Sequence, residues 1–196
     1  APEAETPDIS DDVLKRAAEM INQSEKPYIY CGGGAIRSGC GEEILAIADK
    51  IDAPIGSSLM GLSAIPTASE RALGMTGMHG TYTSSMAKAE SDLILAFGVR
   101  FSDRATGDKS RYAEHAKIIH VDIDDAELNK NIPADLGIHG DMKKILSRLC
   151  AMVEKSEKPD WHAHIASLRE YEKKNVFYGS GKLTPKTVID MVSAEA

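Results

Sequence analysis

Two arginines stand close together after an apolar run in the stretch from Gly98 to Asp108. The run Leu93–Phe97 predicts a buried strand, and Arg100 and Arg104 follow its end. In open α/β sheets, ligands bind in the crevice outside the carboxyl ends of the strands. Arginine at such a position commonly binds phosphate or carboxylate, whose paired oxygens match the planar guanidinium. The stretch therefore predicts an anion-binding loop, and the alternative is a pair of surface arginines that only cap a loop.

Three successive glycines, Gly32, Gly33 and Gly34, lie between the β-type run Tyr28–Cys31 and a predicted helix. Such a turn allows the backbone to approach a pyrophosphate, and N–H groups at a helix N-terminus favour negative charge. The dinucleotide fingerprint G-x-G-x-x-G is not met, because Arg37 stands at the third glycine position. We therefore do not expect a standard NAD-binding turn, and a tight turn without a ligand remains the alternative.

Carboxylates cluster after the predicted strand Lys117–Asp122, at Asp122, Asp124, Asp125 and Glu127. A carboxylate at a strand end can accept hydrogen bonds from sugar hydroxyls. A calcium loop does not fit, because Ala126 stands where the third ligand should be and no glycine follows. For Asp124 and Asp125, capping of the next helix is as good an interpretation as ligand contact.

The sequence contains no recognisable catalytic set. His79 is a single histidine in a long loop, and His162 and His164 are two residues apart on a predicted helix. That spacing suits metal binding from a strand but not from a helix, so we expect both to face solvent. No Ser-His-Asp set, glycosidase carboxylate pair or P-loop can be assembled. The residues predict a nucleotide-shaped cleft with neither a catalytic residue nor a metal site.

Helices and strands alternate along the chain, and this order must position the loops described above. The expected strands are 28–31, 53–58, 93–97, 117–122 and 136–139, and the expected helices begin near Ser10, before Ile44, at Tyr82, at Asp141, at Trp161 and at Thr184. Residues 59–80 are expected to form a long irregular passage. Strands rich in Ile, Leu and Val indicate a parallel sheet with right-handed crossovers. We predict an α/β fold with three layers, a Rossmann-like parallel sheet of about six strands flanked by helices.

Composition narrows the class of protein. The chain has 196 residues, of which 42% are hydrophobic, and a formal net charge of −7, which argues against binding to nucleic acid or to an anionic membrane. No run reaches the roughly 18 apolar residues of a membrane span. The three cysteines show no C-x-x-C spacing and indicate reduced thiols. We therefore expect a cytoplasmic protein without nucleic-acid or membrane partners.

Five segments together resemble, in order, the middle domain of acetolactate synthase, also called acetohydroxyacid synthase. They are residues 32–34, 59–62, 74–81, 98–107 and 121–124, and the match is most specific at G-M-H-G-T and R-F-x-D-R. Members of this family are thiamine-diphosphate-dependent transferases of branched-chain amino acid biosynthesis. They decarboxylate pyruvate and condense the two-carbon unit with a second 2-keto acid.

The resemblance implies a division of labour among three domains. The middle domain carries FAD on a six-stranded parallel sheet, and the two outer domains bind thiamine diphosphate and Mg²⁺. Residues 10–178 would be this central nucleotide-binding domain, 1–9 a linker, and 179–196 the start of the following linker and third domain, poorly ordered or packed on the surface. The implied partners are the outer domains, further copies in a homo-oligomer, a regulatory subunit and 2-keto acid substrates. The fragment alone is expected to be inactive.

The resemblance also assigns cofactor contacts residue by residue. They are Gly32, Gly33, Gly34, Ser58, Leu59, Met60, Thr76, Gly77, Met78, His79, Gly98, Val99, Arg100, Ser102, Arg104, Ala105, Asp122, Ile123, Asp141 and Met142. Met78 and Arg104 match positions that also border the substrate channel, where an arginine can hold a carboxylate. No catalytic residue is assigned to this chain.

Three other identities remain open at this stage. The chain could be the middle domain of another thiamine-diphosphate-dependent oxidase, carboligase or decarboxylase. It could also be a non-catalytic nucleotide-binding module. An NAD-dependent deacylase on a related sheet is the third, and the missing C-x-x-C pairs weigh against it.

Overall fold

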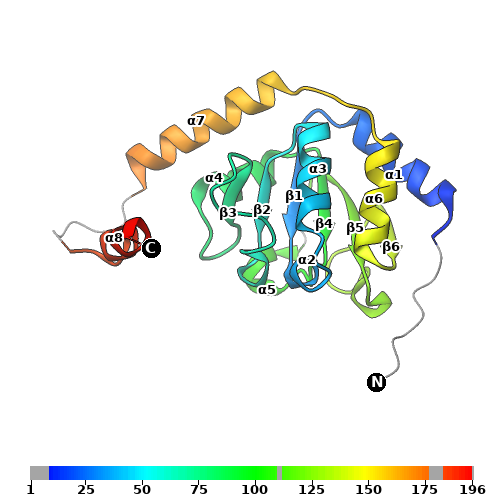
Figure 1. The fold of residues 1–196 in the computed structure, drawn as a ribbon, viewed down its shortest axis with the longest axis horizontal. Helices are drawn as coiled ribbons and strands as arrows, with labels where there is room; N and C mark the ends of the chain where they lie inside the picture. The colour runs from blue at the N-terminus through cyan, green and yellow to red at the C-terminus, as the bar shows by residue number, and fades with distance from the viewer. Residues whose placement is uncertain (1–8, 110–111, 177–182, 196) are drawn as a thin grey trace.

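A single parallel sheet organises the chain in the computed structural model, which describes residues 9–109, 112–176 and 183–195. Its six strands run in the order β3-β2-β1-β4-β5-β6, and every neighbouring pair is parallel (Figure 1). The strands are β1 Pro27–Cys31, β2 Ile55–Ser57, β3 Ala72–Met75, β4 Leu93–Phe97, β5 Lys117–Asp122 and β6 Leu136–His139. The strand order reverses between β1 and β4, which is where open α/β sheets bind their ligands.

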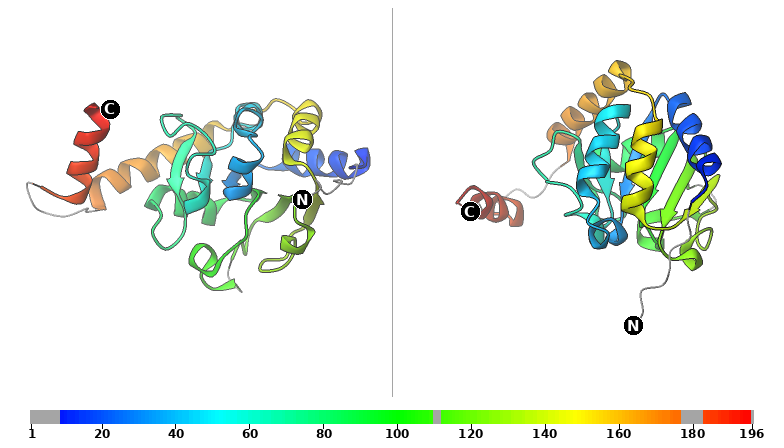
Figure 2. Two further views of the ribbon diagram at one scale, coloured as in Figure 1. Left: turned by 60° about the horizontal axis from the view of Figure 1, so that its bottom comes forward. Right: turned by 45° about the vertical axis from the view of Figure 1, so that its right-hand side comes forward.

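Helices cover both faces of the sheet, which confirms the three-layer α/β prediction. Figure 2 shows α1, α3 and α6 side by side over one face, with α7 behind the sheet. Helix α7 packs against α4 on that second face. The helices are α1 Asp11–Gln23, α2 Gly33–Arg37, α3 Gly41–Ile51, α4 Tyr82–Glu90, α5 Asp103–Thr106, α6 Met142–Met152, α7 Pro159–Asn175 and α8 Pro185–Glu195, with 3-10 turns η1 Leu59–Gly61 and η3 Asp125–Glu127.

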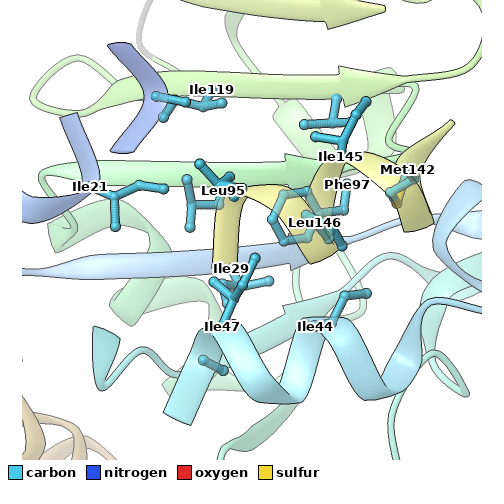
Figure 3. Packing of buried hydrophobic residues seen from close by; sticks show 14 of the residues in the cluster. Ile21, Ile29, Ile44, Ile47, Leu95, Phe97, Ile119, Met142, Ile145 and Leu146 are labelled. Atoms are coloured by element: carbon cyan, nitrogen blue, oxygen red, sulfur yellow. The ribbon is translucent and has the colours of Figure 1, made fainter. Parts of the chain in front are cut away.

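The larger core lies between the sheet and α1, α3 and α6. Ile29, Leu95 and Ile119, from the three central strands, are fully buried. Ile47 of α3 and Leu146 of α6 reach the same layer (Figure 3). Burying a side chain of this size contributes roughly 1.5–3 kcal/mol. Strands β1 and β4 are buried along their whole length, as the apolar runs predict for a sheet covered on both sides.

Helix α7 closes the second core with one apolar stripe. Trp161, Ile165 and Leu168 recur at helical spacing and are buried against the sheet. Trp161 Nε1 donates a hydrogen bond to the Pro27 carbonyl at 3.1 Å, where β1 begins. This bond anchors α7 to the central strand across most of the chain length.

The prediction that both α7 histidines face solvent is only partly right for His164, whose side chain is 40% exposed. Its ring stacks on Trp161 with centroids 5.7 Å apart, and Nε2 pairs with the Glu90 carboxylate of α4. His162 is exposed, but Nε2 lies 2.6 Å from Asp52 Oδ1 at the end of α3. The two rings therefore help attach α7 to different elements.

Strand β3 differs from the prediction that residues 59–80 form an irregular passage. Leu73 is the only residue of this strand that is buried, and Gly74 has a φ of 84°. The pairing of β3 with β2 also shifts register between Ile55 and Gly56. A strand of this kind carries little hydrophobic pattern of its own, so pairing with β2 defines it.

Arg169 of α7 covers the outer edge of β3. Its guanidinium Nη2 donates hydrogen bonds to the carbonyls of Glu70 and Ala72, at 2.7 and 3.2 Å. Because β3 is an edge strand, these carbonyls have no neighbouring strand on that side. The side chain thus takes the place of a sheet partner.

Helix α8 lies beyond the far end of α7, away from the sheet (Figure 1). It confirms the helix expected from Thr184, and none of its residues is buried. Leu183, Ile189, Met191 and Val192 are exposed large apolar residues. Most of the expected linker 1–9, and the start of the segment 179–196, lie outside the described residues, so these domain boundaries stay predictions.

Within the described ranges, none of the helices is long and apolar enough to cross a membrane. Over the same residues, no group of three or more His, Cys, Asp or Glu side chains is arranged to hold a metal ion. Cys31, Cys40 and Cys150 are free thiols, as expected.

The turns after β1 and β4 meet backbone to backbone at the point where the strand order reverses. Gly32 N donates to the Phe97 carbonyl at 2.9 Å, and Gly34 N donates to the Gly98 carbonyl at 3.1 Å. A Cβ built on Gly32 would lie 2.0 Å from Gly98 O, and one on Gly34 would lie 2.6 Å from Gly98 Cα. By contrast, a Cβ on Gly33 would meet only Met60, at 3.2 Å from its Cβ. The glycines therefore have different roles.

This difference predicts that two neighbouring substitutions change the free energy of unfolding by different amounts. Gly32→Ala is expected to lower the free energy of unfolding by about 3 kcal/mol or more, because backbone atoms that cannot move aside occupy the new methyl position. Gly33→Ala is the matched control and is expected to change it by less than about 1 kcal/mol, since alanine suits a helix. Urea denaturation of both variants measures this, and equal losses would contradict the assignment.

Candidate functional site

Every residue predicted to contact a ligand lies at one edge of the sheet. Because all strands are parallel, their carboxyl ends share this edge, the lower edge in Figure 1 where α2 and α5 lie. Strands β1 to β6 lead in turn to residues 32–34, 58–60, 76–79, 98–105, 122–123 and 141–142. The structure thus brings together residues that are more than a hundred positions apart in the sequence.

Phe101 holds the arginine loop in place. Its φ of 46° is in the left-handed region, and its side chain is only 2% exposed. The ring packs against His120 and Tyr112, with centroids 5.0 and 5.6 Å away. Because Phe101 turns inward, its neighbours Arg100 and Ser102 point outward and are exposed, as is Arg104. The loop after β4 thus presents two cations at the edge.

The two arginines are loosely held in the part of the chain that the structure describes. Arg100 Nε lies 3.9 Å from Glu127 Oε1, a long contact to a carboxylate oxygen that also pairs with Lys130 Nζ at 2.9 Å. No ion pair or hydrogen bond of the Arg104 guanidinium occurs among the described residues. Main-chain contacts fix the loop instead: Asn131 Nδ2 donates to Arg100 O at 2.9 Å, and Met78 N donates to Arg104 O at 3.0 Å. Both charges are therefore available to an anion.

Gly33 is the member of the glycine turn that suits contact with a ligand. Gly32 and Gly34 donate to the β4 turn, whereas the Gly33 amide forms no such main-chain bond among the described residues. Only Met60, through its Cβ and its carbonyl oxygen, lies near the position of a Cβ on Gly33, and Met60 is itself exposed. The turn therefore has both a packing role and an open backbone position, so neither of the two interpretations from sequence excludes the other.

Large apolar side chains are exposed along the same edge. Leu59, Met60, Met78 and Ile123 are 69%, 69%, 71% and 55% exposed. Exposed apolar groups that gather beside polar ones commonly mark a ligand or protein contact. Methionine suits the faces of planar rings, because its thioether is flexible and polarizable.

The acidic residues divide into two roles. Asp124 caps η3 by accepting a hydrogen bond from Ala126 N at 3.1 Å, so the capping interpretation is confirmed for this residue. Asp122 is 7% exposed at the end of β5, and its Oδ1 accepts from Asp124 N at 3.0 Å. Its Oδ2 lies 3.9 Å from His120 Nε2. Burial lowers the pKa of His120 more than the Asp122 charge raises it.

Several predicted contacts have side chains that are buried or that cap a helix. Thr76, Val99 and Met142 are nearly fully buried. Asp141 is the N-cap of α6 and accepts from Lys144 N at 3.1 Å. The Thr76 amide is also occupied, because it donates to Ser57 O at 2.9 Å.

Lys88 of α4 contacts the arginine loop. Nothing in the sequence pattern predicts this contact. Lys88 Nζ donates to Ala105 O at 3.3 Å and lies 4.5 Å from the centre of the Tyr112 ring. Burial lowers the pKa of Lys88 to about 8. The contact joins α4 to α5, the short helix that carries Arg104.

In the part of the chain that the structure describes, cavities lie both beside this edge of the sheet and away from it. A small cavity of about 70 Å³ lies beside it, between Ser57, Gly61 and Gly74. A larger cavity of about 470 Å³ lies elsewhere, between α3, the start of β3 and α7, and includes Arg71, Trp161 and Arg169 in its wall. None of the predicted contact residues lines this larger cavity, and both of its arginines are already hydrogen-bonded. We therefore place the candidate site at the edge of the sheet that carries the predicted contacts.

Comparison with known proteins identifies relatives of this chain. The family described as "Thiamine pyrophosphate enzyme, central domain" matches residues 14–149, well over half of the sequence. The chain is 45% identical over 160 residues to a protein of Methanocaldococcus jannaschii named "Probable acetolactate synthase large subunit", covering 80% of this chain and 27% of that protein. It is 36% identical over 184 residues to "Acetolactate synthase isozyme 3 large subunit" of Escherichia coli, covering 90% and 32%.

A third relative, "Acetolactate synthase" of Mycobacterium leprae, is 39% identical over 184 residues, covering 90% of this chain and 29% of that protein. The chain therefore spans about a third of the length of the curated relatives it matches. Most of each relative's sequence therefore lies outside the segment that matches this chain.

The environment of Lys88 predicts a pH-dependent effect of its removal. Lys88→Met is expected to raise the free energy of unfolding by about 2 kcal/mol at pH 7, because the buried ammonium is costly and its two contacts offset only part of that cost. The lowered pKa means that the unfolded state binds more protons between pH 8 and the ordinary lysine value, so wild-type stability rises over that range. The difference between variant and wild type should therefore shrink towards pH 10.

Denaturation at pH 7 and pH 9.5 measures this difference, with Lys173→Met on the exposed face of α7 as the control for a lost surface charge. If Lys88→Met destabilises the protein equally at both pH values, burial of the ammonium is not what sets its contribution.

Proposed function

Because the chain belongs to the family of thiamine pyrophosphate enzyme central domains, we propose that it is the FAD-binding middle part of an acetolactate synthase large subunit. The observation that carries the proposal is that all predicted FAD contacts lie at one edge of the sheet, which includes the switch point between β1 and β4. The names of the relatives support the synthase over other thiamine-dependent enzymes.

The residues at this edge fit the chemistry of FAD. The open backbone at Gly33 and the Arg100 guanidinium suit the pyrophosphate, which needs N–H donors and positive charge. Met60 and Met78 offer polarizable apolar surface to the flavin ring. Asp122 Oδ2, which lies 3.9 Å from His120 Nε2, suits a hydroxyl near the adenosine end.

Arg104 and Met78 have a second role in the proposal. Both are exposed, and the Arg104 guanidinium has no acidic partner among the described residues. Arg104 would hold the carboxylate of a 2-keto acid in the substrate channel, with Met78 forming part of the wall. FAD has a structural role here and is not consumed.

Chemistry belongs to the complete enzyme in this proposal. Thiamine diphosphate with Mg²⁺, bound by the outer domains, supplies the electron sink for decarboxylation of pyruvate and its condensation with a second 2-keto acid. The present chain contributes the nucleotide site and one side of the channel. The proposed setting is a cytoplasmic homo-oligomer with the outer domains and a regulatory subunit as partners.

Titration with FAD tests the nucleotide site directly. Flavin fluorescence is expected to be quenched on binding, and Arg100→Ala should weaken the affinity about ten-fold through loss of a charge-assisted contact. Arg16→Ala, which removes the same charge from α1, is the control and should leave the affinity unchanged. A higher salt concentration should reduce the difference in FAD affinity between wild type and Arg100→Ala, because salt screens exposed charges.

Binding of NAD in place of FAD would contradict the proposal. Equal effects of the two arginine substitutions would show that net charge, and not the site, attracts the flavin. Because outer domains contribute to the complete site, the same titration is also made on the full-length protein.

The full-length protein is expected to form acetolactate from pyruvate only when thiamine diphosphate and magnesium are present. Colorimetric detection of acetolactate measures this. Decarboxylation to the aldehyde without acetolactate would assign the chain to another thiamine-dependent enzyme.

A further inference from the structure

A carboxylate in the last turn of α7 contacts the first turn of α4. Glu172 Oε1 accepts a hydrogen bond from Tyr82 N at 3.0 Å, and Oε2 accepts from Thr83 N at 3.1 Å and from Thr83 Oγ1 at 2.6 Å. The rings of Tyr82 and Tyr171 also contact each other, with centroids 4.8 Å apart. A carboxylate at a helix N-terminus satisfies amides that lack a partner in the helix and complements its dipole.

The first turn of α4 is continuous with a loop of the candidate site. Thr81 is the N-cap: its Oγ1 accepts from Ser84 N at 3.2 Å and donates to Leu73 O at 2.7 Å. Together, Glu172 and Thr81 therefore satisfy the first three amides of α4. Residues 76–80 lie directly before Thr81, so the position of this turn sets where the loop ends.

The same loop also contacts the arginine loop. Met78 N donates to Arg104 O at 3.0 Å, and a Cβ on Gly77 would lie 2.9 Å from that oxygen. Thr81 N donates to Met75 O at 2.8 Å, which closes the loop on the end of β3. A shift of the α4 N-terminus would therefore move Met78 relative to Arg104.

We propose that Glu172 is a positioning residue for the candidate site: through α4, it fixes the loop 76–80 and thereby the affinity for the nucleotide. The identity of that nucleotide rests on the proposed function, whereas the positioning itself does not. Because Glu172 lies in the last turn of α7, displacement of this end of the helix acts on the site.

The opposite end of the same helix pair offers a matched control. Glu90, in the last turn of α4, pairs with His164 of α7. Loss of this contact weakens the packing of α4 on α7. The contact lies at the end of α4 that is far from the loop 76–80. Glu172→Gln and Glu90→Gln therefore remove one carboxylate each from the same interface.

Amide hydrogen exchange without ligand tests the positioning. In Glu172→Gln, the amides of Met78, Gly80 and Thr81 are expected to exchange about five-fold faster than in wild type, while Glu90→Gln leaves them unchanged. Thr83→Val, which removes only the hydroxyl partner, should give a smaller change in the same direction. Thermal unfolding of each variant shows whether it is folded. Unchanged exchange at these amides in Glu172→Gln, or equal changes in both Gln variants, would overturn the proposal.

Flavin titration of the full-length protein supplies the second readout. Glu172→Gln is expected to raise the FAD dissociation constant about five-fold and to alter the visible circular dichroism of the bound flavin, and Glu90→Gln to do neither. Faster exchange in Glu172→Gln together with no FAD binding by wild type would support the positioning and refute the proposed function. Normal FAD binding by wild type with no response to Glu172→Gln would overturn the positioning and leave the proposed function intact.

Discussion

The close contact between two backbone turns, after β1 and after β4, is the constraint on which this structure depends. Gly32 and Gly34 lie against Gly98 with no space for a Cβ on the first two, and Gly98 itself has a φ of 61°. The contact joins the two halves of the sheet where their order reverses. It also places the Arg100 loop beside the open backbone of Gly33, so the packing of the fold and the shape of the candidate site have the same origin.

The fold was largely predictable because the two central strands, β1 and β4, are fully buried and have an apolar pattern of their own. Strands β1 and β4 are continuous apolar runs that end in glycine, and such runs indicate a covered parallel sheet. Strand β3 is different: it has one buried side chain, a left-handed glycine and a register shift against β2. The strand conformation of β3 depends on pairing with β2, which the local sequence pattern does not show. The sequence of β3 alone therefore predicts a loop.

The location of the candidate site was predictable for a similar reason, since each residue needed only to follow a strand. The supports of the site were not. Phe101 adopts a conformation that is rare for a large side chain, and its inward turn is set by the rings of His120 and Tyr112. Lys88 reaches a carbonyl 17 positions away, and Glu172 reaches amides about 90 positions away. Residue type and local spacing do not predict such tertiary contacts.

The edge of the sheet at β3 has a consequence for behaviour at high concentration. A bare strand edge can pair with a strand from another molecule and so begin aggregation or strand exchange. Arg169 occupies the carbonyls of Glu70 and Ala72 and sets a positive charge over them. An incoming strand would have to displace that guanidinium and bury its charge. The Arg169 side chain therefore protects this edge of the sheet from pairing with a strand of another molecule. This protection does not depend on a ligand at the candidate site.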